Sequence, residues 1–142
     1  MKTKKQTTPI TYELIQKRAK AMEKDTTRFL ADLVRTQSFS SKEKNVIAVI
    51  KKEMQAIGFD GIKIDGLGNI IGRIGKGKRV IAFDGHVDTV YRGDRSQWNF
   101  DPFKPFVKAG KIWGRGTVDQ KGGVATMIHA GRLIKELNLQ FN

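Results

Sequence analysis

The sequence predicts an α/β domain in which helices pack against a layer of strands. Apolar residues recur at helical spacing over residues 10–34 and 122–137. Short apolar segments beside glycine-containing turns, residues 62–64 and 69–74, are typical of strands. Residues 80–83 are wholly apolar, which is typical of a strand buried on both faces. Helices that flank such a strand form a layered α/β domain.

The first third of the chain is predicted to be helical. Apolar spacing over residues 10–34 indicates one long helix, or two helices with a break near residues 25–27. Ser40 and Glu43 have the spacing of a capping box, which predicts the start of another helix. Gly58 suits the end of that helix.

Loops and a second hairpin are predicted between the apolar run and the last helix. Residues 91–105 read as a long loop, and residues 106–107 and 111–113 flank a turn at Ala109-Gly110. We expect an aromatic cluster to pin the loop to the core. Its members are Trp98, Phe100 and Phe103.

Composition excludes several classes of protein. The chain has 142 residues, of which 39% are hydrophobic, so one domain with a real core is expected over residues 1–142. It has no cysteine, which excludes a disulfide scaffold, a thiol nucleophile and a zinc–thiolate site. That absence suits a reducing compartment, and we expect a cytoplasmic protein. No apolar stretch approaches the roughly 20 residues of a membrane span.

The net charge of +13, from 27 basic and 14 acidic residues, raises the alternative of a nucleic-acid-binding module. The basic residues are spread along the chain, and no block is dense enough to form a dedicated basic arm. A spread excess is typical of a solvated surface. We therefore do not expect nucleic-acid binding.

The first candidate site follows the apolar run directly. In open α/β sheets, ligands bind beyond the carboxyl ends of the strands, where His86 is expected to emerge. Residues i and i+2 of an extended segment point to the same side, so His86 and Asp88 are expected to meet directly or around a shared metal. Asp88 is then a candidate to hold the second ring nitrogen of His86. By itself, His86 is more typical of a packed or surface histidine than of a ligand.

The second candidate is Asp119, which lies between glycines just before the last predicted helix. Spacing alone favours a helix-capping acid there. The alternative is a carboxylate that bridges two metal ions. We expect Lys121 to be exposed, and His129, within the last helix, to be packed or solvent-facing rather than a ligand.

Residues 72–79 satisfy the spacing Gly-x4-Gly-Lys of a phosphate-binding loop. Arg79 stands where such a loop has Ser or Thr, and a predicted strand follows where it needs a helix. The segment is therefore interpreted as a turn between strands.

Three ordered segments, residues 85–90, 98–103 and 114–123, resemble the family of two-zinc amidohydrolases and exopeptidases. That family includes acetylornithine deacetylase, succinyl-diaminopimelate desuccinylase, aminoacylase-1 and glutamate carboxypeptidase. The resemblance runs from about Tyr12 to Leu137 and looks nearest to the selenium-metabolism-linked hydrolase branch. It implies the N-terminal half of a three-layer α/β/α zinc-peptidase-like catalytic domain, without the family's lid domain.

The resemblance also implies roles for three residues. His86 is implied to be a terminal ligand of one zinc, Asp119 to bridge two zincs, and Asp88 to orient His86. The implied reaction is hydrolysis of an amide bond in a small acyl-amino acid or dipeptide, with two Zn²⁺ per complete site. Ligand type alone leaves Co²⁺ and Mn²⁺ open. Family members are often homodimers through the lid domain.

The sequence also lacks several residues that the family's metal site requires. The family needs a Glu-Glu pair, a further acidic ligand and a distant histidine, all of which are expected to follow Asn142. We therefore expect the isolated chain to be inactive. The alternatives are a non-catalytic fragment that binds metal weakly and the basic nucleic-acid-binding module.

Overall fold

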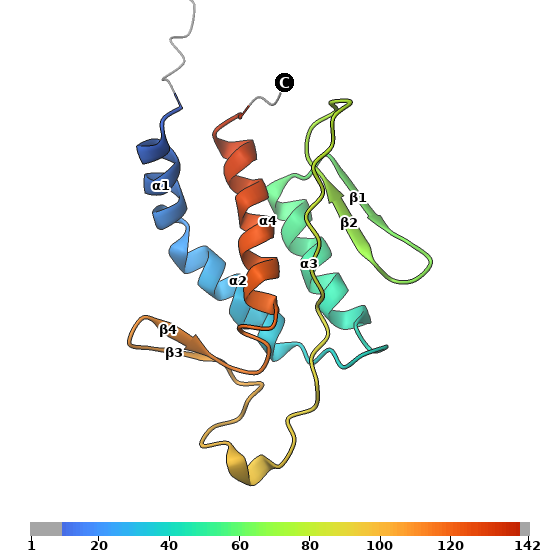
Figure 1. Cartoon of the computed structure of the whole chain (residues 1–142), viewed down its shortest axis with the longest axis vertical. Helices are drawn as coiled ribbons and strands as arrows, with labels where there is room; N and C mark the ends of the chain where they lie inside the picture. Colours follow the sequence, from blue (N-terminus) through green and yellow to red (C-terminus); the bar gives the residue numbers. More distant parts are fainter. Residues whose placement is uncertain (1–9, 140–142) are drawn as a thin grey trace, which may run out of the picture.

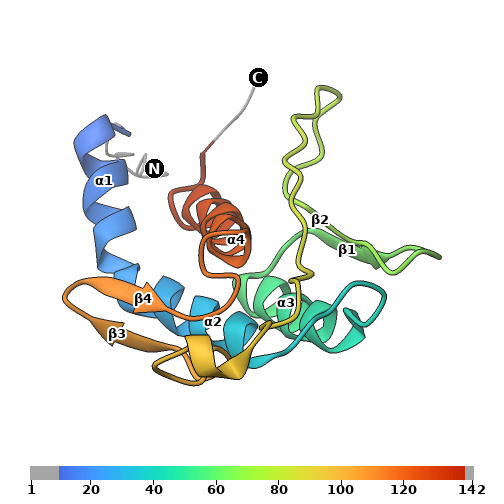
Figure 2. The same cartoon turned by 60° about the horizontal axis from the view of Figure 1, so that its bottom comes forward.

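A computed structural model describes residues 10–139, so both ends of the predicted domain, residues 1–9 and 140–142, lie outside the description. The elements are α1 (Tyr12–Ala21), α2 (Glu23–Arg35), α3 (Lys44–Ile57), β1 (Gly61–Ile64), β2 (Ile70–Arg73), the 3-10 helix η1 (Arg95–Gln97), β3 (Phe106–Lys108), β4 (Lys111–Trp113) and α4 (Lys121–Glu136). Figure 1 shows their arrangement, and Figure 2 shows the two hairpins on opposite sides of the helices.

The first two helices meet at Met22, three residues before the predicted break. Met22 ends α1 and begins α2. Residues 25–27 are helical, and the Thr26 hydroxyl donates a 3.0 Å hydrogen bond to the Met22 carbonyl inside α2. Thr11 caps α1, because its side-chain oxygen accepts from the Leu14 amide at 3.2 Å.

The capping box predicted for α3 does not form. Glu43 occupies the N-cap position without a side-chain cap hydrogen bond, and its carboxylate accepts from the Ser41 amide at 2.7 Å. Ser40 bonds elsewhere, to Asp88. The predicted end is confirmed, because Gly58 adopts the left-handed conformation (φ +82°) that closes the helix.

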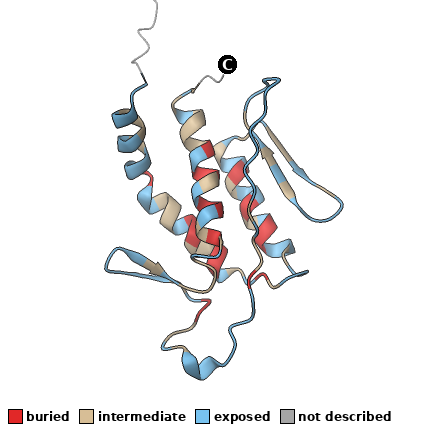
Figure 3. Cartoon of the chain, in the orientation of Figure 1, coloured by how far each residue is buried: buried red, intermediate tan, exposed pale blue. Residues whose placement is uncertain are grey.

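The core lies between α2, α3 and α4, where the residues coloured as buried gather in Figure 3. Helix α1 contributes no buried residue. The core side chains are Phe29, Leu30, Leu33, Val34, Val46, Ile50, Met54, Val124, Ala125 and Ile128. No helix within residues 10–139 has the length and hydropathy to cross a membrane.

Both predicted hairpins form. Strands β1 and β2 pair antiparallel, and a Cβ at Gly72 would lie 2.7 Å from the Phe59 ring, so glycine allows the hairpin to pack closely there. Strands β3 and β4 pair through Phe106 and Trp113. Their turn uses positive φ at both Ala109 (51°) and Gly110 (71°), as a two-residue hairpin turn requires. Residues 74–79 contain no helix, as predicted, but they do not join two strands, because the run that follows β2 is in no sheet.

The strand predicted at residues 80–83 is wrong for this structure. The segment is in no sheet, and the exposed fractions are 71% for Val80, 81% for Ile81 and 76% for Phe83. It has no helix or strand assignment, and Figure 2 shows this part of the chain rising away from the helices. A strand buried on both faces needs neighbouring strands to pair its backbone. No other part of residues 10–139 supplies them.

Candidate functional site

The structure brings the three predicted site residues together. Nε2 of His86 lies 2.9 Å from Oδ1 of Asp119, although 33 positions separate them in the chain. On the other side of the ring, Nδ1 of His86 lies 3.1 Å from Oδ1 of Asp88. The i, i+2 relationship of His86 and Asp88 therefore produces the contact that the sequence predicts.

Two serines that sequence reasoning missed hold this segment in place. Ser38 is fully buried, its hydroxyl donates to the Val87 carbonyl at 2.7 Å, and its own carbonyl accepts from the Thr89 amide at 2.7 Å. The Ser40 hydroxyl donates to Oδ2 of Asp88 at 2.6 Å. Ser38 and Ser40 are two positions apart just before α3, the spacing at which side chains of an extended backbone point to the same side. This spacing is the sequence feature that could have marked both serines as contacts of the His86 segment.

Acceptor oxygens face both nitrogens of the His86 ring. Burial lowers the pKa of His86, but hydrogen bonds to Asp119 and Asp88 and their negative charges raise it more, so the net shift is upward. The hydrogen bond from Ser40 is the main cause of a lowered pKa at Asp88, which stays a carboxylate. The arrangement favours positive charge, a proton or a metal ion, between the His86 ring and the Asp119 carboxylate.

Asp119 does not cap α4. The N-cap residue is Gln120, which makes no side-chain cap hydrogen bond, and the Asp119 side chain is 85% exposed. The turn before the helix needs Gly116, whose φ is +82° and where a Cβ would lie 2.6 Å from Cγ2 of Thr89. The glycines therefore bring the Asp119 segment against the His86 segment.

Lys121 is buried, so the expectation of an exposed lysine is wrong. Nζ of its side chain donates to the carbonyls of Leu33 at 2.7 Å and Thr36 at 2.9 Å. These carbonyls lie at the end of α2, where a cation is favoured by the helix dipole. Burial lowers the pKa of Lys121 to about 8. Because Nζ is committed to α2, Lys121 is not a substrate contact.

The three site residues line an open cleft of about 310 Å³. Arg115 and Trp98 form part of its wall, with the guanidinium carbon 4.8 Å from the centre of the indole ring. Arg115 also donates to the carbonyls of Tyr91 and Arg92 at 3.3 Å. The predicted aromatic anchor is confirmed for Phe103, which is buried, whereas Trp98 and Phe100 are partly buried and pack edge-on against each other.

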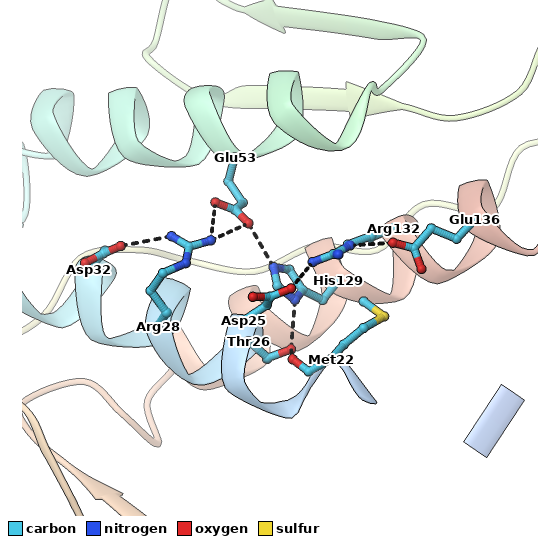
Figure 4. Close-up of polar contacts among 9 residues, drawn as sticks. All are labelled: Met22, Asp25, Thr26, Arg28, Asp32, Glu53, His129, Arg132 and Glu136. Atoms are coloured by element: carbon cyan, nitrogen blue, oxygen red, sulfur yellow. Dashed lines mark hydrogen bonds and ion pairs between the residues drawn. The ribbon is translucent and has the colours of Figure 1, made fainter. Parts of the chain in front are cut away.

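His129 is a packed residue, as predicted. Its side chain is 4% exposed, and its ring stacks on Phe29. Figure 4 shows Nδ1 2.8 Å from the Thr26 hydroxyl oxygen and Nε2 3.1 Å from Oε1 of Glu53. In a separate set of contacts beside it, Glu136, isolated in the sequence, pairs with Arg132. These contacts join α2, α3 and α4 away from the cleft.

The donor atoms in the cleft fit part of a zinc site. An imidazole nitrogen from His86 and a carboxylate oxygen from Asp119 are ligands that zinc accepts, and they already lie side by side. Within residues 10–139, no group of three or more His, Asp, Glu or Cys side chains is arranged to hold a metal ion. Residues 10–139 thus supply two neighbouring metal-ligand atoms, Nε2 of His86 and Oδ1 of Asp119.

Comparison with known proteins shows extended similarity. Residues 82–142 match the family described as Peptidase family M20/M25/M40. The chain is 47% identical over 131 residues to the uncharacterized protein YgeY of Escherichia coli K12, covering 92% of this chain and 32% of that protein. It is 38% identical over 119 residues to a probable succinyl-diaminopimelate desuccinylase of Staphylococcus epidermidis, covering 82% of this chain and 29% of that protein.

A solved structure confirms the predicted fold class. The crystal structure of human carnosine dipeptidase 1 superposes with a TM-score of 0.69 at 21% identity, over 93% of this chain and 32% of that one. The chain spans about a third of the length of the curated relatives it matches. The resemblance inferred from the three ordered motifs is confirmed, and the chain belongs to peptidase family M20/M25/M40.

Proposed function

We propose that this chain forms part of the active site of a metal-dependent hydrolase that cleaves amide bonds, peptide or N-acyl, in small amino-acid derivatives. The observation that carries the proposal is the convergence of His86 and Asp119 on one point of the cleft. The named relatives support the substrate class, because a desuccinylase and a dipeptidase both act on amide bonds in small molecules.

We assign His86 and Asp119 as zinc ligands and Asp88 as a positioning residue. Asp88 contacts Nδ1 of His86, which turns Nε2 toward Asp119 and raises the basicity of the ring. Asp119 would hold zinc through its exposed carboxylate beside the His86 ring. Zinc held by these residues would supply the Lewis-acid chemistry that amide hydrolysis needs at neutral pH.

The cleft wall suits a small substrate. Its volume is about 310 Å³, at the lower end of ligand pockets. Trp98 offers an apolar surface beside the two ligands, and Arg115 is committed to the Trp98 ring and to loop carbonyls. We therefore assign Arg115 to holding the wall rather than to binding the substrate.

Zinc titration by calorimetry at neutral pH tests the ligand assignment. We expect the parent chain to bind zinc weakly, and His86→Ala and Asp119→Asn to lose that binding. Asp84→Asn is the matched control, because Asp84 is an exposed acid of the same segment that makes no assigned contact with zinc. Unchanged zinc affinity in His86→Ala would overturn the assignment, and circular dichroism confirms that each variant folds.

Activity on a panel of N-acyl amino acids and dipeptides tests whether this chain is sufficient for hydrolysis by itself. We expect no hydrolysis by this chain alone, because two donors do not complete a two-metal site. Zinc-dependent turnover by the isolated chain would show that the described residues suffice, contrary to this proposal. Turnover that survives in Asp119→Asn would place the site elsewhere.

A further inference from the structure

A serine hydroxyl outside the pair of assigned ligands begins a series of contacts that passes through the His86 ring. The Ser40 hydroxyl donates to Oδ2 of Asp88 at 2.6 Å, and Oδ1 of the same carboxylate lies 3.1 Å from Nδ1 of His86. On the far side of the ring, Nε2 lies 2.9 Å from Oδ1 of Asp119. The series therefore links the loop before α3 to the turn before α4.

The contacts of Nδ1 determine which ring nitrogen of His86 carries a proton. Nδ1 faces two oxygens of Asp88, the carboxylate Oδ1 at 3.1 Å and the backbone carbonyl at 3.2 Å. Neither oxygen has a hydrogen to donate when the carboxyl group is ionised, so Nδ1 must be the donor. A proton on Nδ1 leaves the lone pair of Nε2 as the one that can bind a metal ion.

Ser40 sets the direction in which the Asp88 carboxylate faces. The Asp88 side chain is 35% exposed, so water reaches it and burial alone does not fix its rotation. The Ser40 hydroxyl occupies Oδ2, which leaves Oδ1 for the His86 ring. Without that hydroxyl the carboxylate is free to turn toward solvent. Nδ1 then keeps only the neutral backbone carbonyl of Asp88, which is a weaker acceptor than a carboxylate.

The loop around Ser40 is itself held in place. Its neighbour Phe39 stacks on the ring of Tyr91, with the ring centroids 4.0 Å apart. Ser38 makes two 2.7 Å hydrogen bonds to the segment that carries Asp88. Ser40 is exposed and is not part of the core. Its hydroxyl is therefore preorganised for the contact, and removing it does not open the core.

We propose that Ser40 is a positioning residue of the zinc site, which acts on His86 through Asp88. By holding the carboxylate, the hydroxyl keeps the proton on Nδ1 and presents Nε2 to the metal ion. Removing a direct partner of a metal-binding histidine weakens metal affinity about 10–100-fold. Ser40 is one hydrogen bond further away, so Ser40→Ala should weaken zinc binding by about three- to tenfold. The proposal rests on the assignment of His86 as a zinc ligand.

A double-mutant cycle in zinc affinity tests the route through Asp88. Zinc binding is followed by NMR titration for the parent, Ser40→Ala, Asp88→Ala and the double variant, each shown to be folded by circular dichroism. The loss caused by Ser40→Ala should disappear when residue 88 is already alanine, because the hydroxyl then has no carboxylate to hold. A loss that persists in the Asp88→Ala background would show that Ser40 acts on the loop instead, and would overturn the proposal.

Ser40→Thr and Ser96→Ala are the matched variants. Threonine keeps the hydroxyl at this exposed position, so Ser40→Thr should bind zinc as the parent does. Ser96 is also an exposed serine beside an aspartate, since its amide donates to Oδ1 of Asp94 at 2.9 Å, and Ser96→Ala should leave zinc binding unchanged. Equal losses in Ser40→Thr and Ser40→Ala would show that the hydroxyl is not the group that matters.

The His86 ring of the zinc-free chain provides a measurement that does not depend on metal binding. Proton–nitrogen NMR spectra of the ring at neutral pH report the hydrogen on Nδ1 and its exchange with water. This hydrogen should be protected in the parent and in Ser40→Thr, and should exchange faster in Ser40→Ala. Equal exchange in all three proteins would contradict the proposal, however weakly the chain binds zinc.

The outcomes separate the role of Ser40 from the ligand assignment. Unchanged zinc affinity in His86→Ala contradicts the assignment of His86, and with it any role of Ser40 in zinc binding. Zinc binding that is lost in His86→Ala but is equal in Ser40→Ala and the parent contradicts the role of Ser40 alone.

Discussion

The ammonium of Lys121 donates a 2.7 Å hydrogen bond to the carbonyl of Leu33, which joins the first turn of α4 to the last turn of α2. Lys121 is 1% exposed and follows Asp119 by two positions. A second bond, to the Thr36 carbonyl at 2.9 Å, completes the contact. The start of α4, just after the proposed ligand Asp119, is therefore held by the buried ammonium of Lys121 and not by a helix-capping side chain.

Lys121→Met should destabilise the chain. The substitution keeps the apolar length of the side chain but leaves the carbonyls of Leu33 and Thr36 without their donor. Losing such a partner costs about 1–3 kcal/mol of unfolding free energy at pH 7. Urea unfolding measures the loss, with Lys51→Met on the exposed face of α3 as the control. Equal midpoints for the two variants would contradict the structural role of Lys121.

The same lysine predicts a pH dependence. Burial lowers the pKa of Lys121 to about 8 in the folded chain, from the ordinary value of 10.5. Between these values the unfolded chain binds more protons, so this group makes folding more favourable as pH rises. The stability difference between the parent and Lys121→Met should grow from pH 8 to pH 10 by up to about 3 kcal/mol. A difference that stays constant would contradict the lowered pKa.

The parts of the fold that depend on local chemistry were predictable. Gly58 ends α3, and Ala109-Gly110 turns the second hairpin, because backbone conformation there depends on a few neighbouring residues. Residues 80–83 were mispredicted for this structure because a buried strand depends on distant partners. The break between the first two helices is predicted at residues 25–27 but lies at Met22. The reason is that the Thr26 hydroxyl bonds within its own helix instead of interrupting it.

The site was predictable where it follows strand geometry or a family motif. The contact of His86 with Asp88 follows from extended backbone, whereas its contact with Asp119 was implied only by the resemblance. Lys121 was missed because nothing local marks a lysine as buried, and burial came from packing against the end of α2. Ser40 was misassigned because its spacing to Glu43 equally suits a helix cap.

Ser40→Ala should raise the pKa of Asp88. The hydrogen bond from Ser40 is the main cause of the lowered pKa of that carboxylate, ahead of the attraction of His86. The pKa should move toward the ordinary value of 3.8, as measured by NMR titration of the side-chain carboxyl.

The sign of the effect on stability follows from linkage. A lowered carboxyl pKa stabilises the fold above the unfolded pKa, and the effect is lost as pH falls through the folded pKa. Ser40→Ala should therefore destabilise the chain at pH 6 and have less effect at pH 2. Ser96→Ala, on η1, is the control and should leave Asp88 unchanged. An unmoved Asp88 pKa in Ser40→Ala would show that Ser40 does not hold the carboxylate.

Glu53→Ala should be among the most destabilising substitutions in the helical layer. The Glu53 side chain is 13% exposed, accepts two hydrogen bonds from Arg28 at 3.1 Å and lies 3.1 Å from Nε2 of His129 (Figure 4). Removing it leaves the buried His129 without its carboxylate partner and takes one of two carboxylates from the exposed Arg28, which costs about 1–3 kcal/mol for the unsatisfied buried group. Asp32→Ala removes the other partner of Arg28 at an exposed position and should cost at most about 1 kcal/mol. Chemical denaturation separates the two, and equal losses would mean that Glu53 acts as a surface charge, not as the link between α2, α3 and α4.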